Sequence, residues 1–306
     1  MPISKFLDPK NDVAFKKIFG TEKNKDILIH FLNDMLIFKE KKPIQEVVFL
    51  KTIQDPDIAA KKTSIVDILC KDGDGNTYIV EMQVAKTKGF EKRAQYYASK
   101  AYSGQINQGG EYANLKEVIF LAIADFVMFP GKVNYKSDHI ILDKDTYEHD
   151  LKDFSFTFLE LEKFTKRKEE LSTLVEKWVY FFKHADETTE SDLKDIIGQD
   201  FIIQKAYEEL NRFYWNEDEL SDYEAVIKKE SDYIASMEQK YDEGFLKGKN
   251  QGFSDGKSEG FLEGQRKKKL LLATRMLETG SDEDFVAKIT GLPAEDVADL
   301  KKNLAS

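Results

Sequence analysis

The chain has 306 residues, of which 41% are apolar and 33% charged, which is enough for a packed core and for two domains or one domain with appendages. No stretch approaches the roughly 18 consecutive apolar residues of a membrane-spanning helix. No apolar run of signal-peptide type follows the first residues, so we expect a cytoplasmic protein without membrane segments. One cysteine, Cys70, excludes an internal disulfide and a cysteine-based zinc site, and the four histidines show no metal-ligand spacing.

The net charge of −10 is unevenly distributed along the chain. Residues 1–130 contain 19 Lys and Arg against 17 Asp and Glu, whereas residues 131–306 contain 27 against 39. Phosphate binding depends on the local surface and not on the charge of the whole chain. The acidity of the C-terminal part therefore does not exclude DNA binding by the N-terminal part.

Helices are the first predicted elements. Residues 11–38 have apolar residues at helical spacing, with Asn11 or Asp12 as the N-cap; Gly20 separates this first helix from a second over Ile27–Ile37. Segments rich in β-branched and apolar residues then predict three strands: Glu46–Lys51, Ser64–Lys71 and Thr77–Ala85.

The next elements alternate between helix and strand. A helix is predicted over residues 90–108, ended by Gly109-Gly110, and a buried strand over Val118–Ala124. Two strand-like passages, around Ile140 and around Phe154–Phe158, are predicted to extend the sheet or to cover it. This order predicts an α/β fold with a mixed central sheet flanked by helices, followed by a mostly helical C-terminal region.

Beyond residue 160 the pattern is mainly helical. Six aromatic residues in this part are candidates for its core: Trp178, Tyr180, Phe181, Phe182, Phe213 and Trp215. We expect four parts in all: an α/β core over residues 1–160, a helical extension over 161–241, a glycine-repeat helical tail over 242–268 and a small helical module over 269–306.

The candidate active site is the hairpin made by the second and third strands. The segment Asp72–Asn76 predicts a tight turn centred on Asp74, so Asp67 faces Glu81 in the antiparallel pair. Gln83 shares the face of Glu81 because strand residues alternate between faces. Opposed residues have Cβ atoms roughly 4.5–5.5 Å apart, so the two carboxylates repel each other unless something neutralises them.

The chemistry of this pair points to a cation. Asp67 interrupts an apolar run, and an unpaired buried carboxylate is costly. A Mg²⁺ held by Asp67 and Glu81 offsets that charge and also polarises a phosphodiester, while Gln83 is placed to orient the attacking water or contact the phosphate. The alternative is that these are ordinary hairpin carboxylates paired with Lys or Arg.

Several spaced motifs occur in a set order along the chain. They are Asp12-Val13-Ala14-Phe15-Lys16-Lys17-Ile18-Phe19-Gly20, Phe31-Leu32-Asn33, Val66-Asp67-Ile68 and Val80-Glu81-Met82-Gln83, followed by Phe90, Arg93, Tyr97, Gln105, Gly109 and Tyr112. Together they resemble the PD-(D/E)XK nuclease superfamily and, within it, the Rpn family of recombination-promoting nucleases, also described as transposase-related. The resemblance extends over nearly the whole chain, because that family also has a glycine-repeat tail.

The resemblance implies a restriction-endonuclease-like core and a DNA endonuclease that depends on Mg²⁺ or Mn²⁺. The metal-binding acids of the family correspond to Asp67 and Glu81, and Asp12 in the first helix is a further candidate ligand. Gln83 stands where the superfamily has a lysine, a departure that the Rpn family shares. Because this removes a cation from beside the phosphate, weakened catalysis is expected.

The helix after the hairpin carries the candidate DNA contacts. Arg93 and Tyr97 share one helical face, and we expect both, with Gln105 further along, to contact DNA. The alternative is that the tyrosines are half-buried packing residues and that Arg93 pairs with Glu91 or Glu81.

Glycine recurs at every fourth position of the tail: Gly244, Gly248, Gly252, Gly256, Gly260 and Gly264. Each interior glycine costs a helix roughly 1 kcal/mol relative to alanine, so the pattern needs a reason. Glycines four residues apart form a smooth stripe that another helix can approach closely, and the charges in the segment exclude a membrane. We expect a homodimer or higher homo-oligomer formed through this stripe; the alternative is a flexible hinge.

The last segment has helix-turn-helix-like spacing around Gly291, but its second helix opens with Glu295 and Asp296, which repel phosphate. A packing or assembly module is therefore favoured over a DNA reader. Two alternatives to a nuclease apply to the whole chain. One is a catalytically silent DNA-binding or assembly protein that retains the nuclease fold, and the other is a helical scaffold organised by the tail.

Overall fold

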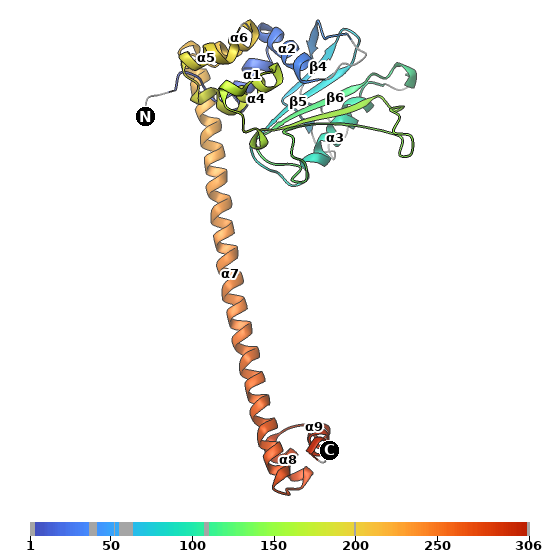
Figure 1. The fold of residues 1–306 in the computed structure, drawn as a ribbon, viewed down its shortest axis with the longest axis vertical. Helices are drawn as coiled ribbons and strands as arrows, with labels where there is room; N and C mark the ends of the chain where they lie inside the picture. The colour runs from blue at the N-terminus through green and yellow to red at the C-terminus, as the bar shows by residue number, and fades with distance from the viewer. Residues whose placement is uncertain are drawn as a thin grey trace. The chain divides into compact units, whose positions relative to one another are not determined.

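The structure is a computed structural model that describes residues 4–36, 42–51, 53–54, 64–106, 110–198 and 200–304. The chain divides into two units, Met1–Lys229 and Glu230–Ser306 (Figure 1). None of the helices in the described ranges combines the length and the apolar character that crossing a membrane requires.

A six-stranded mixed sheet forms the centre of the first unit (Figure 1). Its strands, in spatial order, are β1 (Val47–Phe49), β4 (Ile68–Asp72), β5 (Thr77–Gln83), β6 (Val118–Ala124), β8 (Phe154–Glu160) and β7 (Lys136–Ile140). The pairs β5–β6 and β6–β8 are parallel, and the other three pairs are antiparallel. The predicted passages around Ile140 and Phe154–Phe158 thus extend the sheet. A separate two-stranded ladder pairs β2 (Ile53–Gln54) with β3 (Ser64–Ile65).

Helices cover both faces of the sheet. Those of the first unit are α1 (Asp12–Phe19), α2 (Lys25–Met35), α3 (Phe90–Ser103), α4 (Leu174–His184), α5 (Glu190–Ile197) and α6 (Phe201–Glu209). One face packs on α3, where Phe90, Ala94 and Ala98 meet Ile79 and Phe120. The other packs on the larger cluster that α1, α2, α4 and α6 build. The predicted mixed sheet flanked by helices is confirmed.

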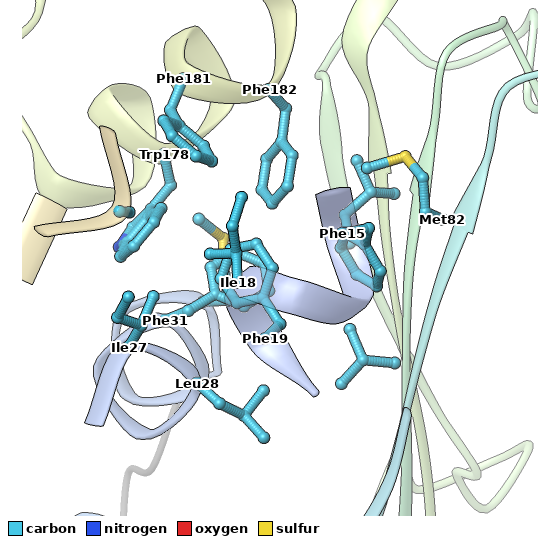
Figure 2. Packing of buried hydrophobic residues seen from close by; sticks show 14 of the residues in the cluster. Phe15, Ile18, Phe19, Ile27, Leu28, Phe31, Met82, Trp178, Phe181 and Phe182 are labelled. Carbon is cyan, nitrogen blue, oxygen red and sulfur yellow. The ribbon is translucent and has the colours of Figure 1, made fainter. Parts of the chain in front are cut away.

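An aromatic cluster holds α1, α2 and α4 together (Figure 2). The ring centroid of Phe19 lies 5.1 Å from those of Phe15 and Phe31, 5.6 Å from Phe182 and 5.9 Å from Trp178. All five side chains are fully buried. Aromatic pairs at such distances contribute about 0.5–1.5 kcal/mol each beyond their area burial, so this cluster fixes where α1 lies against the sheet.

The predicted strand Ser64–Lys71 is interrupted in the structure. β3 ends at Ile65 and β4 begins at Ile68, with a bend at Asp67 between them. The Oδ2 atom of Asp67 accepts the backbone N–H of Met82 at 2.9 Å. A side-chain oxygen thus takes a ladder hydrogen bond that a backbone carbonyl would otherwise accept, which is why the regular strand stops there.

Two further predictions need correction. The helix predicted over residues 90–108 ends at Ser103, where the N–H of Gly104 bonds the carbonyl of Lys100 at 3.0 Å; residues 107–109 lie outside the described ranges. Among the six aromatic core candidates, Phe213 is 77% exposed, because it lies in a short 3₁₀ turn between α6 and the following helix. Tyr180 is half-buried and the other four are buried.

The second unit is helical. It contains most of α7 (Glu217–Glu278), together with α8 (Glu283–Thr290) and α9 (Ala294–Leu304). The end of α7 packs on α8 and α9 through Ala273, Val286, Leu292 and Val297. The glycine-repeat segment is helical within α7, and its residues are almost all exposed. The finer boundaries at residues 160, 241 and 268 stay predictions.

A half-buried carboxylate lies in the segment before α1. The Asp8 side chain is 33% exposed; its Oδ2 lies 3.9 Å from Nζ of Lys10, which is itself 2.9 Å from Oδ2 of Asp125. Burial raises the pKa of Asp8 to about 6; Lys10 opposes this shift, while Asp186 and Asp125 add to it. The folded state therefore binds the Asp8 proton more tightly than the unfolded chain does.

This preference predicts a pH dependence of stability. The pKa of Asp8 is higher in the folded than in the unfolded state. Its stabilising contribution to the free energy of unfolding is therefore full below about pH 4 and is lost as the pH rises through about 6. Asp8→Asn keeps the acceptor for the Lys10 N–H and removes the charge, so we expect a higher Tm than wild type above pH 6 and a smaller difference near pH 4. Thermal denaturation from pH 4 to 8 measures this, with the exposed Asp74→Asn as control. A Tm difference that does not change with pH would contradict the assignment.

Candidate active site

The predicted register of the β4–β5 hairpin is confirmed. Lys71 pairs with Thr77 and Ile68 with Val80, around a turn in which Gly75 has φ +88°. The ladder ends at the Ile68–Val80 pair, so the predicted Asp67–Glu81 pair lies one residue beyond it, where the chain bends at Asp67. A hydrogen bond holds the Asp67 carboxylate in place: its Oδ2 atom accepts the N–H of Met82. The hairpin therefore brings both predicted carboxylates to the same end of β5.

Glu81 lies on the face of the sheet that α3 covers. Ile79 belongs to the α3 side, whereas Val80 and Met82 belong to the α1 side, and strand alternation sets Glu81 with Ile79. Glu81 is only 3% exposed, and its Oε1 atom has no hydrogen-bond partner among the described residues. Its registered neighbour on β6 is Ala122.

Gln83 connects Glu81 to α3. Its Nε2 donates to Oε2 of Glu81 at 3.2 Å and to the carbonyl of Met82 at 2.8 Å, and its Oε1 accepts a hydrogen bond from the guanidinium of Arg93. The Arg93 Cζ lies 4.8 Å from the ring centroid of Phe90 and 6.0 Å from that of Tyr97. The observed partner of Arg93 is thus the Gln83 amide, and the helix supplies a cation next to the carboxylates.

The first helix reaches the same site. On α1, Nζ of Lys16 lies 2.7 Å from Oδ1 of Asp12 and 4.0 Å from Oδ1 of Asp67. The Asp12 and Lys16 side chains are 49% and 43% exposed, against 18% for Asp67. Exposure therefore increases from Glu81 through Asp67 to the Asp12–Lys16 pair. The sequence reasoning did not single out Lys16, although its position one turn after Asp12 was a usable signal.

Electrostatics at the site penalise two negative charges. Burial, and after it the Asp67 charge, raise the pKa of Glu81 to about 8 against the opposing effect of Arg93. Burial also raises the pKa of Asp67, while the Met82 N–H, Lys16 and Arg93 lower it. A cation or a proton beside these carboxylates is therefore stabilising.

The remaining two candidates differ in placement. Tyr97 is close enough to Glu81 and Asp67 for their charges to raise the pKa of its hydroxyl, although burial is the larger cause. Gln105 lies beyond the end of α3 at Ser103, 12 residues after Arg93. Its amide holds the backbone N–H and carbonyl of Lys116, each at 2.9 Å. The structure places Tyr97 beside Arg93 and does not bring Gln105 there.

The donor set can be compared with what a divalent metal needs. In the described part of the chain, no three His, Cys, Asp or Glu side chains are grouped as a metal-binding cluster. Nevertheless, Glu81 presents a buried carboxylate oxygen without a partner, and Asp67 lies beside it. Carboxylate oxygens are the usual protein ligands of Mg²⁺, which often binds through one or two carboxylates and keeps its other positions for water and phosphate oxygens. The residues present fit such an ion.

Comparison with known proteins identifies the family. No curated protein and no solved structure matches the chain. Residues 9–240 match the family described as PD-(D/E)XK nuclease family transposase, and this range contains all the candidate site residues. The match confirms the resemblance to a transposase-related PD-(D/E)XK nuclease. The chain belongs to the PD-(D/E)XK nuclease family transposases.

Proposed function

We propose that the protein is a metal-dependent DNA endonuclease that hydrolyses phosphodiester bonds with Asp67, Glu81 and Gln83, and that it is of the recombination-promoting type. Family membership supports a nuclease that acts on DNA. The observation that carries the proposal is the Glu81 carboxylate, which is buried next to Asp67 and has an oxygen without a partner. Such an arrangement is costly unless a ligand compensates for it.

The chain's own residues have distinct parts in this proposal. Asp67 and Glu81 would hold Mg²⁺ or Mn²⁺, with Asp12 as a further ligand. When bound, the ion polarises the phosphodiester and lowers the pKa of a coordinated water. The Met82 N–H orients the Asp67 carboxylate, and the Gln83 amide orients that of Glu81. Gln83 is neutral, so it positions groups and does not remove a proton.

Residues of α3 would contact the DNA backbone. The Arg93 guanidinium has five N–H donors, and those not used by Gln83 can donate to a phosphate. Its position against the Phe90 and Tyr97 rings restricts its rotation, and the Tyr97 hydroxyl lies near the same carboxylates. Gln105 can contact DNA only if it breaks its two hydrogen bonds to the backbone of Lys116.

The central prediction concerns Asp67 and Glu81. We expect Asp67→Ala and Glu81→Gln to lower cleavage of supercoiled plasmid in Mg²⁺ by about 100-fold or more, because each removes a negatively charged ligand, and EDTA to abolish wild-type cleavage. Glu81→Gln preserves the side-chain shape and replaces a buried ionisable group by a neutral one, so it should fold at least as well as wild type.

The matched control is Asp74→Asn, which removes an exposed carboxylate from the turn of the same hairpin and should leave cleavage unchanged. Equal cleavage by wild type and Asp67→Ala would refute the proposed site. DNA binding without cleavage, unaffected by metal, would instead support the catalytically silent DNA-binding or assembly protein.

Self-association through the glycine repeat is a separate part of the proposal. We propose that α7 forms a homodimer or higher homo-oligomer through the stripe from Gly244 to Gly264. A Cβ built at any of its six glycines meets no atom within 4 Å in the single chain, so packing within one chain gives no reason for glycine. Close approach of a second helix gives one.

Substitutions with opposite effects test the stripe. Alanine at Gly252 and Gly256 should stabilise an isolated helix by about 1 kcal/mol per site. Leucine at the same two positions should hold a partner helix away and convert an oligomer to a monomer, as measured by light scattering after size exclusion. The control is leucine at Ser254 and Ser258, which have the same spacing on the opposite side of the helix. The same mass for both leucine variants would exclude the stripe as the interface.

A further inference from the structure

Two cations lie beside the carboxylates of the site, and they come from helices that pack on opposite faces of the sheet. Arg93 lies on α3, where Gln83 and two aromatic rings hold it. Lys16 lies on α1, and among the described residues its ammonium is within hydrogen-bonding distance of Asp12 alone. An ammonium has three N–H donors on a flexible four-carbon stem, so Lys16 retains donors for another ligand.

Lys16 occupies the solvent-accessible end of the carboxylate row. Glu81 is 3% exposed, whereas the Lys16 side chain is 43% exposed and still lies 4.0 Å from Asp67. A DNA duplex is too wide to enter a buried site, so its phosphates reach the row from the exposed end. The Lys16 ammonium is a positive charge at that exposed end, 4.0 Å from Asp67.

The neighbouring lysine on the same helix shows that this orientation is particular to Lys16. Lys17 pairs with Glu219, and its Nζ lies 4.2 Å from the ring centroid of Trp215. It attaches α1 to the start of α7, while Lys16 faces the candidate site. Successive residues of a helix point about 100° apart, and here that rotation separates a packing lysine from one at the carboxylates.

We propose that Lys16 is the residue that binds the DNA phosphate next to Asp67, supplying from α1 the positive charge that the neutral Gln83 does not provide on β5. This inference rests on the proposed nuclease function. Asp12 holds the ammonium toward Asp67 through both of its oxygens, at 2.7 and 2.9 Å, and thereby positions it. A bound phosphate would accept one of the remaining donors.

The simpler interpretation is that Lys16 and Asp12 form an ordinary i, i+4 pair on a helix surface. Such a pair is worth only about 0.3–0.5 kcal/mol, so its loss leaves the protein folded and does not depend on DNA. The two interpretations differ in DNA affinity and in its salt dependence, which a purely helix-stabilising pair does not change.

The test measures binding of a short duplex of mixed sequence by fluorescence anisotropy in EDTA, over a series of salt concentrations. We compare wild type, Lys16→Met, Lys16→Arg and Lys23→Met. Lys23 is the matched control, because its side chain is 72% exposed and pairs with Glu209 away from the site. Lys16→Met should weaken binding several-fold and reduce the slope of log Kd against log salt by about 0.9, the value for one lost phosphate contact. Lys16→Arg should restore both.

The outcomes separate this inference from the proposed function. Equal affinity and slope for Lys16→Met and Lys23→Met overturn the role of Lys16, while Mg²⁺-dependent cleavage that needs Asp67 still supports the nuclease. A Lys16-dependent salt slope in a protein that never cleaves supports Lys16 as a phosphate ligand and overturns the nuclease. Where both hold, Lys16→Met should also lower kcat/KM by about tenfold or more in Mg²⁺.

Discussion

The burial of the Glu81 carboxylate beside Asp67 is the constraint on which the arrangement of the first unit depends. A charge that is 3% exposed loses most of its hydration, so every neighbouring element must compensate. The hairpin does so through the Gln83 amide, which donates to Glu81, while the Met82 N–H binds Asp67; α3 does so through the charge of Arg93. None of these compensations satisfies Oε1 of Glu81, and this deficit supports the proposed ligand site over a structural ion pair.

The positions of the site side chains depend on the packing of α1 and α3 away from the site. α1 reaches Asp67 because Phe15 and Phe19 anchor it in the aromatic cluster with Trp178 (Figure 2). On the other face, Phe90 and Ala94 seat α3 against the sheet, which brings Arg93 to Gln83. Close-packed cores tolerate little volume change, so mutations in either cluster should displace charged side chains that they do not touch.

Most residues of the motifs that carry the family resemblance serve the fold. Phe15, Phe19 and Phe31 are fully buried. Asn33 holds the backbone N–H and carbonyl of Ile44 at 2.8 Å each, which fastens the chain ahead of β1. The motif that begins at Asp12 thus combines core residues with two charged ones at the site. This combination explains how a small number of spaced motifs can indicate both a fold and a chemistry.

The sequence by itself determined the main elements, the mixed sheet and the register of the β4–β5 hairpin, because strand alternation, helical periodicity and turn chemistry are local. It also indicated the family. The tertiary structure alone decided that Asp67 breaks its strand, that Arg93 binds Gln83 and that Lys16 joins the site. These contacts link residues 10 to 51 positions apart through the packing of helices on a sheet, and no local pattern in the sequence encodes those distances.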